Sequence, residues 1–139
     1  MDTSCIFCQI IAGNSKSYKV YEDEKCFAFL DIHPINPGHL LLIPKKHVIN
    51  FYELDDVTYS HLMLIAKKLS DQINKTFKPK KVGLVIAGWD IPHAHIHILP
   101  TNDYHDITSK SLLEGKKSNP SEKELEETVN KIRFELADK

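Results

Sequence analysis

Short runs of apolar residues, several of them alternating with polar ones, predict five β-strands at residues 18–21, 26–30, 39–44, 82–87 and 93–100. The first two strands flank a charged stretch, which is typical of a hairpin. The third follows Pro37-Gly38 and is apolar after its first residue, which indicates burial on both faces. The fifth begins with a strict alternation of histidine and apolar residues. These runs predict a mostly antiparallel sheet.

A helical spacing replaces the strand pattern from about Leu54 to Phe77. Asp55 or Asp56 is the candidate N-cap of this helix, and Pro79 prevents it from continuing. We expect this long helix to cover one face of the sheet. Apolar residues recur along it every three or four positions, at Leu62, Ile65, Ala66, Leu69 and Ile73.

Two shorter helices are predicted near the ends of the chain. Residues 5–11 form a short apolar segment closed by Gly13, and Ser121 and Glu124 make a capping box before a second helix. The polar residues 101–119 are predicted to be a loop. The chain shows no repeat or linker, so we expect one α+β domain over residues 1–139, with its core at about 5–100. The apolar stripe of the last helix consists of Leu125, Val129, Ile132 and Leu136.

The charge balance and the hydropathy narrow the range of partners. The 139 residues carry 18 Lys and Arg against 19 Asp and Glu, a net charge of −1 with histidine neutral. A strongly basic nucleic-acid-binding protein is therefore not expected. The chain has no apolar run of about 18 residues, and its first residues lack the basic start of a signal peptide. We expect a cytoplasmic protein that binds neither nucleic acid nor membrane.

Among eight histidines, His93, His95 and His97 are the most informative. Residues two apart in a strand share a face, so the three imidazoles are expected in a row about 6–7 Å apart. The apolar residues between them are expected to face the core. Histidine titrates near neutral pH, binds metals, and acts as a nucleophile or as a general acid or base. The row therefore indicates either a metal site or a catalytic histidine oriented by its neighbours.

Two of the three cysteines form the motif Cys5-x-x-Cys8. This spacing suits a zinc site completed by two histidines, for which His47 and one histidine of the row are candidates. A redox pair is the alternative, although no thioredoxin-like βαβ pattern surrounds the motif. Cys26 lies in an apolar strand and is interpreted as a buried structural thiol.

Several other polar residues allow more than one interpretation. His39 could support the histidine row or be a plain loop residue. Asp31 could bind a sugar diol or cap the turn that follows it. We interpret His33, His61 and His105 as loop or helix-surface residues.

The chain resembles the histidine triad family on several motifs that occur in that family's order. The run His93–Leu99 fits the family's pattern of three histidines alternating with apolar residues. The segments Cys5–Gly13, Phe29–Ile32 and Pro37–His47 support the resemblance, which covers about residues 5–100. The histidine run and Pro37–His47 are together its most specific part.

This resemblance implies a homodimer with a continuous sheet across its interface, and a cleft that binds a purine nucleotide. It implies that His95 attacks the α-phosphorus and forms a covalent nucleotidyl-histidine, which water then hydrolyses. It also places His97 beside the phosphate and His39 near the other nitrogen of the nucleophile. The nucleotide-binding residues that it implies are Ile6, Phe7, Phe29 and Ile32 for the base and Asp31 for the ribose.

The resemblance further implies a structural Zn²⁺ ion held by Cys5, Cys8, His47 and His93. The chain departs from the family before the triad, where Trp89 and Asp90 replace a small hydroxyl or amide. Thr101 also stands where the family has an arginine. An acidic side chain near a phosphate is unfavourable unless it turns away or meets a cation.

The expected activity is hydrolysis or nucleotidyl transfer at the α-phosphorus of purine nucleoside phosphoramidates or related nucleotidyl conjugates. A dinucleoside polyphosphate hydrolase is the close alternative. A non-catalytic protein that binds nucleotide or zinc is a second alternative, which the Trp89-Asp90 departure favours. A metal-handling protein that uses the histidine row itself is the third.

Overall fold

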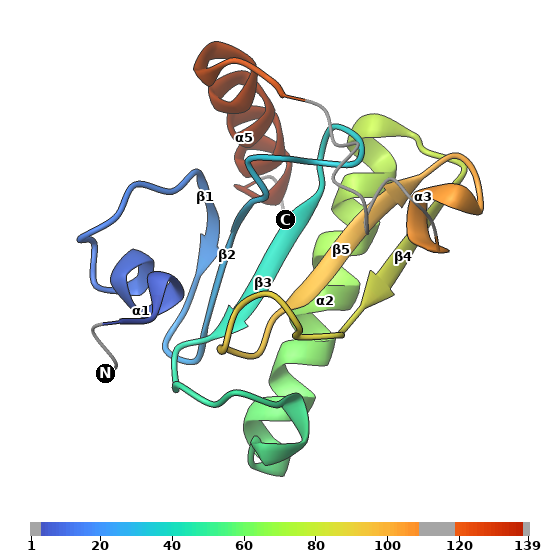
Figure 1. The fold of residues 1–139 in the computed structure, drawn as a ribbon. Helices are drawn as coiled ribbons and strands as arrows, with labels where there is room; N and C mark the ends of the chain where they lie inside the picture. The colour runs from blue at the N-terminus through green and yellow to red at the C-terminus, as the bar shows by residue number, and fades with distance from the viewer. Residues whose placement is uncertain (1–3, 109–118, 138–139) are drawn as a thin grey trace.

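The computed structural model describes residues 4–108 and 119–137, whose five strands form one antiparallel sheet (Figure 1). Their order across the sheet is β1-β2-β3-β5-β4, and the neighbouring strands all run antiparallel. The predicted α+β class with a five-stranded sheet is confirmed. The strands are β1 (Lys19–Glu22), β2 (Cys26–Leu30), β3 (Leu40–Pro44), β4 (Lys81–Val85) and β5 (Ile96–Thr101).

The long helix begins and ends as the sequence predicts. Its first turn is capped by Asp55, whose Oδ2 accepts the backbone N–H of Thr58 at 3.0 Å. Its C-cap, Lys78, adopts a left-handed φ of 50° directly before Pro79. The helices in the described ranges are α1 (Ile6–Ile11), α2 (Asp56–Phe77), α3 (His105–Thr108) and α5 (Glu122–Ala137), with a 3-10 turn, η1, at Phe51–Glu53.

The predicted capping box also forms at the start of α5. The backbone N–H of Glu124 donates to the Ser121 hydroxyl at 3.2 Å, and the Glu124 carboxylate accepts the Ser121 N–H at 3.2 Å. The first three residues of the predicted stripe, Leu125, Val129 and Ile132, are buried. The side chain of Leu136 lies outside the described residues.

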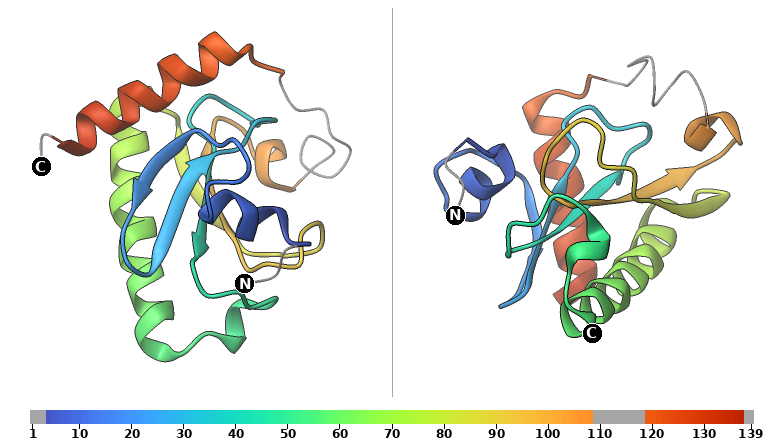
Figure 2. Two further views of the ribbon diagram at one scale, coloured as in Figure 1. Left: turned by 90° about the vertical axis from the view of Figure 1, so that its left-hand side faces the viewer. Right: turned by 60° about the horizontal axis from the view of Figure 1, so that its bottom comes forward.

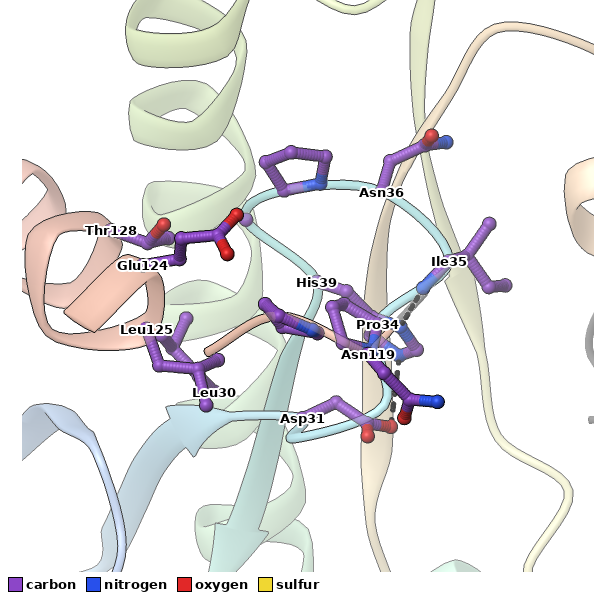
Figure 3. Close-up of a pocket in the computed structure, with 13 residues that line it drawn as sticks. Leu30, Asp31, Pro34, Ile35, Asn36, His39, Asn119, Glu124, Leu125 and Thr128 are labelled. Carbon is purple, nitrogen blue, oxygen red and sulfur yellow. Dashed lines mark hydrogen bonds and ion pairs between the residues drawn. The ribbon is translucent and has the colours of Figure 1, made fainter. Parts of the chain in front are cut away.

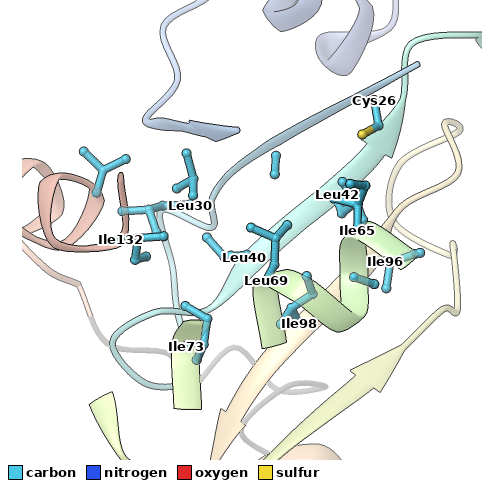
Figure 4. Close-up of a cluster of buried hydrophobic side chains, with 14 of the residues drawn as sticks. Cys26, Leu30, Leu40, Leu42, Ile65, Leu69, Ile73, Ile96, Ile98 and Ile132 are labelled. Carbon is cyan, nitrogen blue, oxygen red and sulfur yellow. The ribbon is translucent and has the colours of Figure 1, made fainter. Parts of the chain in front are cut away.

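One face of the sheet packs against α2 and α5 (Figure 2). Alternate residues of β2 and β3 point to this side, and Figure 4 shows Leu40 and Leu42 in one cluster with Ile65 and Leu69 of α2. The opposite side chains of the same strands, such as Leu41, form a second cluster with α1. Strands β2 and β3 are therefore buried on both faces, as predicted for the third strand.

Two expectations about the chain after residue 90 are wrong. The fifth strand begins at Ile96 rather than at His93, because the N–H of Ala94 donates to the carbonyl of Val48, beyond the end of β3, at 2.7 Å. The predicted loop 101–119 contains the single-turn helix α3. Residues 109–118 of that loop lie outside the described part. None of the described helices is both long and apolar enough to cross a membrane.

Candidate functional site

A pocket of about 350 Å³ opens between α1, the start of the loop after β2, and the histidine run. His95 and His97 form one wall of it, and Asp90 also lines it. A nucleoside is apolar on its base and polar at its sugar and phosphate, which matches the mixture of side chains in this pocket. The residues that the resemblance assigns to nucleotide binding all line it: Ile6, Phe7, Phe29, Asp31 and Ile32.

The histidine run lies on the α1 face of the sheet, opposite its apolar partners. Ile96 and Ile98 belong to the core under α2, whereas His95 and His97 line the pocket. The ring of Phe7 contacts His95 edge-on at a centroid distance of 5.4 Å and His93 at 5.8 Å. The alternation that the sequence predicts is thus kept, although His93 itself precedes the strand.

His95 is buried and has its two ring nitrogens in different surroundings. Its Nδ1 lies 2.8 Å from the backbone carbonyl of His93. Only an N–H can make a hydrogen bond to a carbonyl, so this contact assigns the proton of a neutral His95 to Nδ1. The lone pair is then on Nε2, where the carboxylate of Asp90 lies 3.3 Å away. The Nε2 end of the ring therefore faces the Asp90 carboxylate in the pocket.

A second pair of histidines, His39 and His97, lies beside His95. His39 is fully buried, and its Nδ1 accepts the backbone N–H of Ile35 at 3.2 Å. Its Nε2 therefore carries the proton and donates to Nδ1 of His97 at 2.9 Å. The remaining proton of a neutral His97 is then on Nε2, so that nitrogen can donate to a phosphoryl oxygen.

The contacts of His39 correct one expectation. The resemblance places this residue near the second nitrogen of the nucleophile, but that nitrogen of His95 is occupied by a backbone carbonyl. His39 instead contacts His97 and lies 3.5 Å from the Asp31 carboxylate. It therefore contacts the last histidine of the row rather than His95.

Asp31 caps the turn after β2, and its side chain also lines the pocket. One carboxylate oxygen accepts the backbone N–H of His33 at 2.8 Å and so caps the turn after β2. The other lies near His39, and the residue lines the nucleotide-sized pocket. Asp31 also borders a second cavity of about 330 Å³, between the loop that carries Asn36 and the α5 residues Glu124 and Thr128 (Figure 3).

Four potential metal ligands meet at the base of α1: Cys5, Cys8, His47 and His93. Their ligand atoms all lie within 4.8 Å of one another. Nδ1 of His93 is 3.4 Å from Sγ of Cys5, and Nδ1 of His47 is 3.3 Å from Sγ of Cys8. The two Nδ1 atoms are 3.2 Å apart.

These distances suit a tetrahedral zinc ion. Bonds of about 2.0–2.3 Å from zinc to nitrogen and sulfur separate the ligand atoms by about 3.3–3.8 Å. The Nε2 of His93 lies 2.8 Å from the carbonyl of Pro44, which places a proton there and directs the Nδ1 lone pair to the cluster. Burial is the main cause that lowers the pKa of His93 below its ordinary value, which favours the neutral form that a ligand needs. The donor set therefore fits a structural metal.

The remaining predicted residues are spread over the fold. His33 and His105 are exposed, and Cys26 is buried in the core with a raised pKa that burial mainly causes. His61 is more than a helix-surface residue, because its Nε2 pairs with the Asp23 carboxylate at 2.6 Å. This pair joins α2 to the β1–β2 turn. The spacing of residues in the sequence does not predict it.

The three residues that depart from the family's pattern, Trp89, Asp90 and Thr101, lie in different surroundings. Trp89 is 95% exposed, whereas Asp90 lines the pocket. Thr101 is buried, and its hydroxyl donates to the carbonyl of Lys81 at 3.0 Å, so it fixes β5 to β4. The contact between Asp90 and His95 was missed by sequence reasoning, which identified the residue but not its partner.

Comparisons with known proteins agree with this arrangement. The HIT domain pattern matches residues 12–104. The adenosine 5′-monophosphoramidase HNT1 of Saccharomyces cerevisiae is 36% identical over 104 residues, which are 74% of this chain and 66% of the yeast protein.

Two solved structures share the fold over nearly the whole chain. A Hit-like protein from Bartonella henselae superposes with a TM-score of 0.82 at 29% identity, over 98% of this chain and 99% of that one. A zinc-bound histidine triad family protein from Mycobacterium smegmatis gives a TM-score of 0.80 at 25% identity, over 97% and 94% of the two chains. With three histidines in the family's pattern, the family's fold and its domain matched across residues 12–104, this chain belongs to the HIT, or histidine triad, family.

Proposed function

We propose that this protein hydrolyses purine nucleoside phosphoramidates or related nucleotidyl conjugates at the α-phosphorus, through a covalent intermediate on His95. The observation that carries this proposal is the contact between Nδ1 of His95 and the carbonyl of His93, which leaves the lone pair on Nε2. That nitrogen belongs to a residue lining a pocket of nucleotide size. The similarity to a yeast adenosine 5′-monophosphoramidase supports the choice of substrate.

The reaction takes place in two displacements. In the first, the Nε2 lone pair of His95 forms a bond to phosphorus, the P–N bond to the leaving amine breaks, and the amine takes a proton from solvent. In the second, a water oxygen bonds to phosphorus, the bond from phosphorus to Nε2 breaks, and the water gives up a proton. The products are the free amine and the nucleoside monophosphate, and dividing the displacement lowers each barrier.

The other pocket residues bind and orient the substrate. Nε2–H of His97, fixed by its hydrogen bond from His39, donates to a phosphoryl oxygen. The carboxylate of Asp31 accepts hydrogen bonds from the ribose hydroxyls. The base packs on the apolar side chains of Ile6, Phe7, Phe29 and Ile32.

The metal cluster serves the site as a structural support. Zinc, when bound by Cys5, Cys8, His47 and His93, supplies a rigid crosslink between α1 and the two segments that flank the pocket. His93 thereby belongs to the metal site and His95 to the chemistry. The backbone carbonyl of His93 is the connection between them.

We further propose that two copies of the chain associate through β4 and α2. Strand β4 is at the edge of the sheet, and it leaves Leu84 39% exposed. On α2, beside it, Leu64 is 66% exposed and Tyr59 38% exposed. These side chains line a shallow apolar hollow beside β4, the edge strand of the described sheet, which a second β4 strand would cover. The assembly would contain two HIT-like domains, each formed by residues 1–139.

Two other functions remain as competing candidates. A dinucleoside polyphosphate hydrolase would use the same nucleophile with a phosphate leaving group in place of an amine. A protein that binds nucleotides without turnover is favoured by the carboxylate of Asp90, which lies at the attacking atom of His95.

Turnover of adenosine 5′-phosphoramidate by the purified protein tests the proposal. We expect release of AMP by the wild type and a loss of at least about 1,000-fold in kcat for His95→Ala, because the covalent route is closed. The matched control is His105→Ala, an exposed histidine outside the pocket, which should keep full activity. Equal turnover by wild type and His95→Ala would refute the mechanism. Tight AMP binding without turnover by either would support the non-catalytic alternative.

A further inference from the structure

We propose that Asp90 selects the leaving group, favouring nucleotidyl conjugates whose leaving amine carries a positive charge and opposing those that leave as phosphates or other anions. This inference rests on the proposed function of the same pocket and specifies its substrate class. It assigns a selective role to a carboxylate that lines the pocket beside His95.

The position of Asp90 relative to the nucleophile carries the inference. Its Oδ1 lies 3.3 Å from Nε2 of His95, the atom whose lone pair attacks phosphorus. A phosphorus atom must approach along that same side of the ring, because the opposite nitrogen is hydrogen-bonded to the carbonyl of His93. The carboxylate must then move aside to the rim of the pocket, where it remains within a few Å of the phosphorus. The negative charge of Asp90 therefore attracts a cationic leaving group and repels an anionic one.

The surrounding charges do not cancel that of Asp90. The charged side chains among the residues that line the pocket are Lys16, Asp31 and Asp90. The amine of Lys16 is 3.4 Å from the carboxylate of Glu122, so its charge is shared with another acid. Asp31, which also caps the turn after β2 and lies near His39, adds a second negative charge to the pocket. The His95 end of the pocket is therefore acidic on its solvent side, which favours a cation there.

The exposure of Asp90 sets the type of group that it can recognise. Its side chain is 67% exposed and lines the pocket, so it lies where a leaving group would emerge into solvent. A carboxylate at such a position attracts an organic ammonium group through its charge. An anionic leaving group, such as the second half of a dinucleoside polyphosphate, would instead meet a like charge.

Three AMP conjugates whose leaving amines differ in charge provide the test, and each is compared between the wild type and Asp90→Asn so that differences in the intrinsic reactivity of the amines cancel. The amines are 1,2-diaminoethane, propylamine and glycine, which present a cation, a methyl group and an anion at nearly the same position. We expect kcat/KM to fall in that order for the wild type. Asp90→Asn should reduce the ratio of the cationic to the anionic substrate by about tenfold, because a partly exposed charge pair is screened by water and salt.

A control variant and a binding measurement separate the possible outcomes. Asp103→Asn removes the same charge from an exposed position outside the pocket and should leave the ratio unchanged. A binding measurement that does not depend on turnover gives a second readout. Asp90→Asn should strengthen the binding of ADP relative to that of AMP by several-fold, as measured by calorimetry. If Asp90→Asn changes all three substrates equally and leaves the ADP-to-AMP ratio unchanged, Asp90 does not select the leaving group. If the wild type cleaves none of the conjugates, the proposed function fails, and the ADP-to-AMP ratio alone decides the role of Asp90.

Discussion

The Nδ1 atom of His95 lies 2.8 Å from the backbone carbonyl of His93, a residue whose own ring belongs to the metal cluster. The four-residue cluster and His95, the proposed nucleophile, are therefore joined by one hydrogen bond. A metal ion that holds the ring of His93 also restrains the backbone of that residue. The carbonyl of this backbone in turn sets the tautomer and orientation of His95. A structural metal in this position would influence catalysis without touching the substrate.

Loss of the metal site should therefore lower both stability and turnover. We expect the purified protein to contain about one zinc per chain by elemental analysis, and Cys8→Ser to lose it. Structural zinc contributes several kcal/mol to folding, so the melting temperature of Cys8→Ser should fall by more than about 10 °C. Its kcat should fall as well, because His95 loses its support.

The third cysteine provides the matched control for that prediction. Cys26 is buried in the core, on the other face of the sheet from the metal cluster. Cys26→Ala should cost about 1 kcal/mol through the small cavity that it leaves, but it should keep the zinc. Retention of full zinc content by Cys8→Ser would contradict the ligand set.

The turn that positions His39 depends on Gly38. Gly38 has a φ of +95°, and a Cβ added there would lie 2.8 Å from Cδ2 of Phe77. Gly38→Ala should therefore lower the free energy of unfolding by about 2–4 kcal/mol, through backbone strain and the displaced ring. Gly13 has a similar φ of +82° but open space around it, so Gly13→Ala should cost only about 1 kcal/mol. Equal losses for the two variants in urea titrations would show that the contact with Phe77 is unimportant.

The Asp23 carboxylate should make the protein sensitive to acid. Burial alone would raise its pKa, but hydrogen bonds from His61, Tyr21 and the backbone N–H groups of Lys25 and Cys26 outweigh burial and hold the pKa well below its usual value. A carboxyl group with a lowered folded-state pKa stabilises the fold above its unfolded pKa of about 3.9. This stabilisation is lost as the pH falls below that value.

We therefore expect Asp23→Asn to lower the free energy of unfolding at pH 7 by about 1–3 kcal/mol. The difference between wild type and variant should shrink as the pH falls from about 5 to 2, in melts followed by circular dichroism. Glu24→Gln, which removes an exposed neighbouring charge, is the control and should change little. A difference that stays constant with pH would mean that the charge of Asp23 is not what stabilises the turn.

The proposed dimer predicts a change of mass in solution. Leu84→Asp would bury a charge against the partner's edge strand, so it should convert a dimer to a monomer in light-scattering measurements at micromolar concentration. Phe134→Asp adds a charge at another exposed apolar residue, on α5, a helix that contacts β1 at the sheet edge opposite β4, and should leave the dimer intact. A wild type that is already monomeric under these conditions would rule out the dimer.

Periodicity predicted most of the fold because most of its helices and strands follow local patterns of alternation and capping. The boundaries of β2 and the caps Asp55 and Ser121 agree with the sequence, since alternation and capping depend only on neighbouring residues. The start of β5 was misplaced, because Ala94 bonds to Val48, a partner 46 positions earlier that no local pattern reveals.

The candidate site likewise depends on contacts between distant segments, which local sequence patterns do not reveal. The histidines were identified from their spacing and from the family resemblance, but spacing could not show which of them touch. His39 joins His97 rather than His95, His61 joins Asp23, and Asp90 reaches His95. Each of these pairs depends on how distant segments pack.

The cytoplasmic location expected from the sequence remains a prediction.

The covalent bond between His95 and phosphorus can be observed directly. The protein is mixed rapidly with adenosine 5′-phosphoramidate and denatured in alkali, where a nucleotidyl-imidazole survives, and its mass is then measured and mapped by fragmentation. We predict one added nucleoside monophosphoryl group per chain, located on His95 and absent from His95→Asn. An adduct on His93 or His97, or full turnover by His95→Asn, would contradict the role of His95 as nucleophile.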